Sequence, residues 1–350
     1  MDEVRRAESE RKPLPNRRTA GEGAGSIHDA TRPAQTQIHM NQRGAFNIGF
    51  LTELEQDKFW ESLPRMKSLE YLGLGEPKNT GWNARRIGSL TALKNLGALA
   101  LSGYGNKNEE SEIPKALSTL PKLRHLRLPR YGSLMENETE MPQGLTQLIT
   151  LYLPRFDTDF ARWAGSLSAL QELGLHVKGA NYRWHEGYFN VLAKLPKLTR
   201  LDMHLIGVPE EAYAGLGALP VKDLRVSGGY QSDELVPLIV ACPHLEVLIC
   251  NHRVTATPKL WAAIAKCNRL RVLSIGHGDA KELGAAFEVL TRLEVYCDPA
   301  AKDWALADVE EILKAPKLQV VVRFGLKAEL MKAITDARPA MRIHRGQSWE

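Results

Sequence analysis

Cysteine is scarce in this sequence, with four residues in a chain of 350. A disulfide scaffold needs a much denser cysteine pattern in a short secreted chain, so we exclude that class and expect reduced thiols. No uninterrupted apolar run approaches the roughly 20 residues of a transmembrane helix, which excludes a membrane span. The first residues, MDEVRRAESERK, contain no apolar segment. We therefore expect no secretory signal and a cytoplasmic location.

An excess of charge of one sign is also lacking. The formal net charge is +5, from 46 basic and 41 acidic residues. This excess is too small to argue for a nucleic-acid partner by itself. Signature motifs of common enzymes are absent, including GxSxG, HExxH, the P-loop and the protein-kinase set. What is present is typical of a globular protein, with 43% hydrophobic and 25% charged residues.

Residues 1–45 differ from the rest of the chain. They mix charged residues with Pro, Gly, Ser and Ala, and they contain few large apolar side chains. Such a segment cannot bury enough surface to offset its ordering entropy, so we predict a disordered or linker tail. Three basic pairs within it would suit nucleic acid or nuclear import, but interleaved acidic residues favour a solvated linker. Residues 346–350 are predicted to form a second, short tail.

The region between these tails, residues 46–345, repeats one pattern. A unit of the form L-x-x-L-x-L, such as LEYLGL or LRHLRL, recurs about every 25 residues, inside the range of leucine-rich repeats. Side chains alternate across a strand, so the leucines would share a core while the intervening residues face the other side. One copy cannot bury its leucines, but stacked copies can. The units start at Leu69, Leu96, Leu123, Leu148, Leu170, Leu198, Val221, Leu245, Leu270, Leu290 and Ala315. The register of the last two stays open by three residues, and RPAMRI at 338–343 is a candidate twelfth strand.

These roughly eleven units resemble the leucine-rich repeat family. The resemblance implies an α/β solenoid, or horseshoe, with a parallel β-sheet on the concave face, irregular convex segments early and helices later. Start signals support the later helices, since Thr257-Pro258 precedes KLWAAIAKC and Pro209 precedes EEAYAGLGAL. Two copies, CPHLEVLIC and CNRLRVLSI, look like the cysteine-containing, ribonuclease-inhibitor-like repeats of ubiquitin-ligase substrate receptors. That subfamily carries an F-box near its N-terminus, and none is recognised in residues 1–65.

Stacking places equivalent outward residues about 5 Å apart, so columns on the concave face can be predicted. One column places Glu172, Arg200 and Asp223 in alternating sign, and the next places Asp202 beside Arg225. This ladder can neutralise itself in solvent or recognise the charges of a partner, and both interpretations stay open. The tenth copy is predicted to present three residues outward, Arg292, Glu294 and Tyr296.

A second outward group combines arginine with aromatic side chains, which is the usual composition of binding hot spots. We expect this group to contact a partner. Together with the charged ladder and two histidines, it makes up the predicted partner-binding residues. They are Tyr71, His125, Arg127, Arg130, Tyr131, Tyr152, Arg155, Phe156, Glu172, His176, Arg200, Asp202, His204, Asp223 and Arg225.

Metal and cofactor sites are not expected. His176 and His204 should stack as neighbours and would suit a metal or a pH sensor. No third ligand accompanies them, so we predict no metal site. Cys242, Cys250 and Cys267 fall at or beside core positions of their repeats. We predict that they are buried as small hydrophobic residues and bind no zinc.

The family resemblance implies a non-enzymatic module that binds another protein through its concave face, and neither a membrane nor a nucleic acid is expected as partner. The alternative is an adaptor or secreted bacterial effector, similar to ubiquitin-ligase receptors, with residues 1–45 as a docking or delivery segment. A third hypothesis is an enzyme built around His176, His204, Asp202 and Glu172. A wide concave face excludes water poorly, which argues against it.

Overall fold

The computed structural model describes residues 53–74, 84–101, 117–128, 145–153, 164–178, 187–214, 216–229, 232–250, 254–276, 280–299, 303–323 and 325–344. Both predicted tails lie outside the described residues, and so does the segment on which the adaptor or effector hypothesis depends. No helix in the described part of the chain is long and apolar enough to span a membrane.

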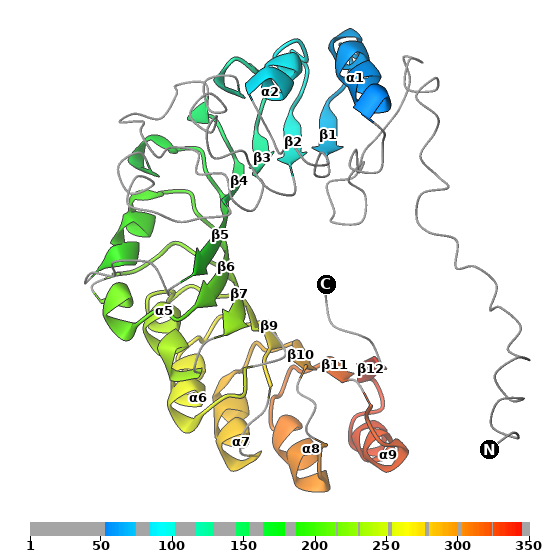
Figure 1. The fold of residues 1–350 in the computed structure, drawn as a ribbon. Helices are drawn as coiled ribbons and strands as arrows, with labels where there is room; N and C mark the ends of the chain where they lie inside the picture. The colour runs from blue at the N-terminus through cyan, green and yellow to red at the C-terminus, as the bar shows by residue number, and fades with distance from the viewer. Residues whose placement is uncertain are drawn as a thin grey trace, which may run out of the picture.

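One parallel sheet connects the repeats from end to end. Its twelve strands follow chain order, and each is hydrogen-bonded to the next. They line the inner side of an arc, and the helices lie on its outer side (Figure 1). The strands are β1 (Tyr71–Leu74), β2 (Ala98–Leu101), β3 (His125–Arg127), β4 (Thr150–Leu153), β5 (Glu172–Lys178), β6 (Arg200–Ile206), β7 (Asp223–Gly229), β8 (Val247–Cys250), β9 (Val272–Ser274), β10 (Val295–Asp298), β11 (Val320–Arg323) and β12 (Arg342–His344).

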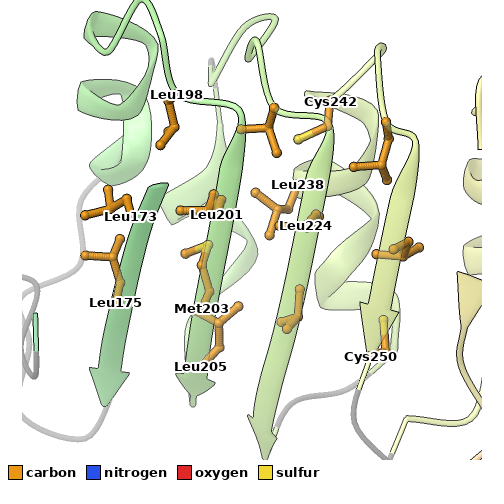
Figure 2. Packing of buried hydrophobic residues seen from close by; sticks show 14 of the residues in the cluster. Leu173, Leu175, Leu198, Leu201, Met203, Leu205, Leu224, Leu238, Cys242 and Cys250 are labelled. Carbon is orange, nitrogen blue, oxygen red and sulfur yellow. The ribbon is translucent and has the colours of Figure 1, made fainter. Parts of the chain in front are cut away.

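The core is a ladder of aliphatic side chains between the sheet and the outer layer. The second leucine of each early unit pairs in register with that of the next, as Leu173 does with Leu201 and Leu201 with Leu224. Figure 2 shows these three side chains on successive strands, and all are at most 1% exposed. Burying one such leucine contributes roughly 1.5–3 kcal/mol. The stacked-leucine prediction is confirmed.

The outer layer starts with helices at the N-terminal end. Helix α1 (Glu53–Ser62) brings Phe59 and Trp60 into the core, with their rings edge to face at 5.2 Å. Helix α2 (Ala84–Leu90) follows β1. A repeat stack needs such a cover because its first unit has no preceding neighbour to bury its leucines.

Short 3₁₀ helices also belong to the outer layer. One of them, η3 (Leu63–Arg65), follows α1 directly. The described middle of the layer contains η5 (Ala164–Ser166), η7 (Tyr188–Lys194) and η8 (Glu210–Tyr213). The predicted helix after Pro209 is therefore wrong in type, since it forms only this last, four-residue turn. Tyr213 ends the turn and stacks on Phe189 at 5.1 Å. Gly217 then adopts a positive φ of 69°, a conformation that costs glycine little. A right-handed helix cannot continue through a residue with this φ.

The C-terminal half carries the predicted helices. They are α5 (Val236–Val240), preceded by η9 (Ser232–Leu235), then α6 (Pro258–Ile264), α7 (Ala280–Val289), α8 (Leu306–Ile312) and α9 (Ala328–Ala337). The start signal of α6 is confirmed, because the Thr257 hydroxyl accepts a hydrogen bond from the Leu260 amide at 3.2 Å. A Thr cap of this kind contributes about 1 kcal/mol.

The register of the last repeats departs from the prediction. Val295, not Arg292, pairs with Val272, and Val320 pairs with Val295. The tenth and eleventh units therefore start three residues later than predicted, at Leu293 and Leu318. The cause is that Leu290 and Leu293 are both fully buried, so either one fits the pattern. Tyr296, predicted to face outward, lies in the core with no exposed surface.

The corrected register reveals a buried ion pair in place of the third leucine of these two units. Asp298 and Arg323 are paired strand neighbours, and their side chains are 0% and 4% exposed. The Arg323 Nη1 lies 3.4 Å from the Asp298 carboxylate. Trp304 Nε1 donates a hydrogen bond to the same carboxylate at 2.5 Å, and the guanidinium lies 5.7 Å from the Trp304 ring centroid. Charged groups this deeply buried are stable only when paired and hydrogen-bonded.

Candidate binding surface

The concave face is built from outward residues of neighbouring strands, in the columns predicted for the first nine repeats. His125, Thr150, Glu172, Arg200 and Asp223 follow one another in register across β3 to β7. The next column contains Arg127, Tyr152, Gly174, Asp202 and Arg225 in the same order. Strands β5 to β7 have seven residues each, whereas every other strand has three or four. The polar outward residues thus lie on the longest part of the sheet.

Tyr152 lies across the next strand because a glycine leaves room for it. A Cβ atom added to Gly174 would stand 2.0 Å from the Tyr152 ring, so no other residue fits beneath this side chain. On the opposite side, the Arg127 guanidinium lies 5.6 Å from the ring centroid. Such a cation–π contact contributes about 0.5–1 kcal/mol at an exposed site. Arg127 and Tyr152 therefore form one half-buried unit. Their predicted contact with a partner stays a prediction.

The alternating ladder forms across three strands, although loosely. The Arg200 guanidinium lies 3.9 Å from the Glu172 carboxylate and 3.6 Å from that of Asp223. Both contacts are longer than a hydrogen bond, and the buried Nε atom of Arg200 has no hydrogen-bond partner among the residues that the structure describes. The ladder combines two carboxylates with one guanidinium and leaves one donor of Arg200 unused within the described part of the chain.

The predicted pair between Asp202 and Arg225 does not form. Arg225 instead donates two hydrogen bonds, both 3.1 Å, to Asp223 on its own strand. Residues two apart on a strand point to the same face, so this bidentate pair was geometrically available. Within the described residues, the Asp202 carboxylate has no hydrogen bond and no ion pair.

Burial changes the acidity of two groups on this surface. Desolvation raises the pKa of Asp202, although the nearby Arg200 and Arg225 act in the opposite direction. Desolvation also raises the pKa of Tyr152, so its hydroxyl stays protonated at neutral pH. The surface therefore offers a partner a half-buried carboxylate, a phenol and a guanidinium.

Two of the predicted histidines, His125 and His204, are engaged in local contacts. His125 Nδ1 lies 3.0 Å from the Thr150 hydroxyl, and His204 Nδ1 lies 3.0 Å from the Ser227 hydroxyl. The register places His176 beside His204, as predicted. No group of three potential metal ligands occurs among the residues that the structure describes. Of the four residues in the hypothetical catalytic site, His204 contacts the Ser227 hydroxyl and Asp202 lies near Arg200 and Arg225.

One predicted contact residue lies apart from these columns, and four others lie outside the described residues. Tyr71 is 45% exposed but lies on β1, two strands from His125 and separated from it by the buried Ala98. The remaining ones, Arg130, Tyr131, Arg155 and Phe156, lie outside the described residues.

The same two columns continue as an apolar surface, of which the part on β8 and β9 has the predicted register and the part on β10 and β11 does not. The outward residues of β8 to β11 are almost all aliphatic, which becomes clear only in the corrected register. The signal was present in the sequence as valine before each second core position. The residues are Val247, Val272, Val295 and Val320 in one column, and Ile249, Ser274, Cys297 and Val322 in the next.

The predicted burial of the cysteines is confirmed. Cys242, Cys250 and Cys267 are at most 3% exposed and lie within the main core. Cys242 and Cys250 are seen among the leucines in Figure 2. Burial raises the pKa of these two thiols to about 12 and that of Cys267 to about 11.

Comparison with known proteins supports the fold. No family model matches this chain, and no curated protein matches it. A chain in the crystal structure of the Rad7 and Elc1 complex of yeast is similar, with a TM-score of 0.50 and 16% identity over 81% of this chain and 77% of that one. The crystal structure of human 5T4 (Wnt-activated inhibitory factor 1, trophoblast glycoprotein) has a TM-score of 0.41 and 18% identity, over 59% of this chain and 82% of that one. The second likeness is too distant to carry an argument.

The parallel sheet, the buried leucine ladder and the outer helices define the class of protein. This chain is an α/β leucine-rich repeat solenoid, with twelve strands in the residues that the structure describes. The likeness to the yeast structure concerns this architecture alone.

Proposed function

We propose that this chain is a non-enzymatic protein-binding module that uses the concave face of its sheet. The surface we assign to the partner centres on His125, Arg127, Tyr152, Asp202 and Arg225, with the Glu172–Arg200–Asp223 ladder among them. A curved stack can vary these outward residues without disturbing its leucine core.

The observation that carries this proposal is the arrangement around Tyr152. Its ring occupies the space above Gly174, with Arg127 over one side. Rigid aromatic and arginine side chains contribute most to binding energy when they are already held in place. The adjacent Asp202 carboxylate lacks a hydrogen bond within the described residues, so it can still bind a group from outside.

The test compares partner capture with stability. Full-length protein, the double variant Arg127→Ala/Tyr152→Ala and the convex-side variant Val289→Thr are used as baits, and captured proteins are identified by mass spectrometry. Val289 lies on α7 and is 51% exposed, so it serves as a matched surface control.

We expect the double variant to lose its specific partner, with an affinity at least about 30-fold weaker, as for removal of a hot spot worth 2 kcal/mol. Its free energy of unfolding should stay within about 1 kcal/mol of wild type, since both side chains are outside the core. Undiminished capture by the double variant, or loss of capture together with loss of folding, would contradict a surface role.

A further inference from the structure

A column of valines continues the charged surface toward the C-terminal end. Val247, Val272, Val295 and Val320 are in register on four adjacent strands. The first three are half-buried, whereas Val320 and Val322 on β11 are buried, with 8% and 5% exposed, so the accessible part of the column ends at β10. Their neighbours in the next column include Ile249 and Val322. We call these six residues the valine strip.

The border of the valine strip is polar where its strands begin. Glu246, Arg271 and Glu294 directly precede three of the strip valines. Glu246 pairs with Lys222 at 3.3 Å, and Arg271 pairs with Glu294 at 2.9 Å. An apolar centre with a polar border is the usual anatomy of a protein–protein interface. Because these charges are paired with each other, the strip attracts a partner through apolar contact.

A carboxylate without a hydrogen bond or ion pair among the described residues lies on the N-terminal side of the strip, whereas the exposed Arg342 of β12 borders the strip on its other side, in register with Val320. Asp202 lies on β6, two strands from Val247 and Ile249 on β8. Its register neighbour Arg225 is bonded to Asp223, which leaves the Asp202 carboxylate available. A cation from a partner would supply the hydrogen bonds that this half-buried carboxylate lacks.

We infer that the partner is a protein segment that crosses the strands, with an apolar stretch on the valine strip and a basic side chain at Asp202. This inference rests on the proposed function and adds the chemistry and direction of the bound segment. Strands are about 4.8 Å apart, so the basic group sits about 10 Å from β8 and the apolar contact extends about 10 Å further, to Val295 on β10. In a bound helix each of these spans is about six or seven residues.

The experiment uses a phage-displayed library of random 20-residue peptides selected on the immobilised full-length chain. Enriched peptides are synthesised, and their affinities are measured by fluorescence anisotropy for wild type, Asp202→Asn, Val272→Thr/Val295→Thr, Arg127→Ala/Tyr152→Ala and the convex control Val289→Thr. Threonine keeps the shape of valine, and circular dichroism verifies that each variant is folded. Enriched peptides should share a basic residue separated from an apolar block by the spacing given above.

We expect the valine-pair variant to bind at least tenfold more weakly and Asp202→Asn about tenfold more weakly, with no change for Val289→Thr. Replacing the basic residue of the peptide by glutamine should weaken binding to wild type but have little further effect on Asp202→Asn. This non-additivity identifies direct contact between the two groups.

Other outcomes overturn the inference in distinguishable ways. Peptides sensitive only to Arg127→Ala/Tyr152→Ala would overturn it and leave the proposed function standing. Peptides insensitive to every concave variant would overturn both, and a library without enriched peptides would overturn the inference. Self-association by sedimentation velocity, or binding to phosphatidylserine vesicles, that is lost in the valine-pair variant would assign the strip to a second copy or to lipid instead.

Discussion

The two stretches of the concave face differ in chemistry although they stand on the same core. On β5 to β7 the outward residues are charged, with Glu172, Arg200 and Asp223 in one column. On β8 to β11 the same column contains only valine. The leucines behind both stretches are equally buried. Inward positions therefore specify the solenoid, while outward positions can vary without disturbing the core.

The core itself differs between the two ends of the sheet. Repeats up to β9 place an aliphatic side chain or cysteine at the third core position, such as Leu175 or Cys250. The tenth and eleventh repeats, with strands β10 and β11, have Asp298 and Arg323 at this position. An ion pair in this environment has to be complete, because either group alone would be a buried, uncompensated charge.

The largest expected effect on stability comes from removing one member of this ion pair. Asp298→Leu leaves Arg323 buried without its partner and should lower the free energy of unfolding by about 3–5 kcal/mol. The double variant Asp298→Leu/Arg323→Leu restores the aliphatic pattern of the other repeats and should recover most of that loss. Urea denaturation measures both variants. A double variant as unstable as the single one would show that the ion pair is not a substitute for the leucines.

A second, somewhat smaller effect tests whether the core is uniform. Leu201→Ala on β6 and Leu273→Ala on β9 each remove a fully buried side chain, one behind each stretch of the concave face. Each should lower the free energy of unfolding by about 2–5 kcal/mol, measured by urea denaturation. Val272→Thr, the outward neighbour of Leu273, serves as the control and should change stability far less. A loss confined to one of the two leucine sites would contradict a continuous core.

The pH dependence of stability sharpens the comparison on the charged side. Because the pKa of Asp202 is raised in the folded protein, mainly by desolvation, ionisation of this carboxyl disfavours folding. The penalty develops as pH rises from the unfolded-state pKa, about 4, through the folded-state pKa, and it is constant above that. Asp202→Asn should therefore be more stable than wild type at pH 7, and the difference should vanish near pH 3.5. Thermal unfolding at several pH values measures it, and a variant less stable at pH 7 would contradict this sign.

The smallest effect distinguishes the thiols on the two sides of the sheet. Cys242 and Cys250 lie in the main core with pKa values raised to about 12, whereas Cys297 belongs to the small apolar cluster around the valine strip. Native protein at pH 8 should react slowly with Ellman's reagent, since little thiolate is present. Peptide mapping should find Cys297 modified first, because its modification does not require opening of the main core. Equal rates at all cysteines would indicate global unfolding.

Much of the fold follows from the sequence alone. The spacing of leucines predicts the parallel sheet, the outward columns of the first nine repeats and the later helices, because burial of an aliphatic ladder dominates the energetics. The same logic fails where two leucines three residues apart are both buried. Leu290 then fits the first position of a repeat as well as Leu293 does. With Leu290 as the start, the register is wrong by three residues, and Val295 and Val320 are not recognised as outward residues.

The candidate surface is less predictable than the fold. Its columns follow from the repeat, but side-chain pairing does not, as Arg225 shows by bonding Asp223 in place of Asp202. A long arginine side chain reaches several carboxylates at similar cost, so local geometry decides among them. The space that Gly174 leaves for Tyr152 also becomes evident only when neighbouring strands are placed together.

Hydroxyl-radical footprinting of the chain bound to its captured partner tests the central claim most directly. If the concave face is the interface, Tyr152 and Ile249 should be protected on binding, while Val240 and Leu306, both more than half exposed on the outer helices, should react as in the free protein. Protection of Val240 and Leu306 with unchanged labelling of Tyr152 and Ile249 would contradict it.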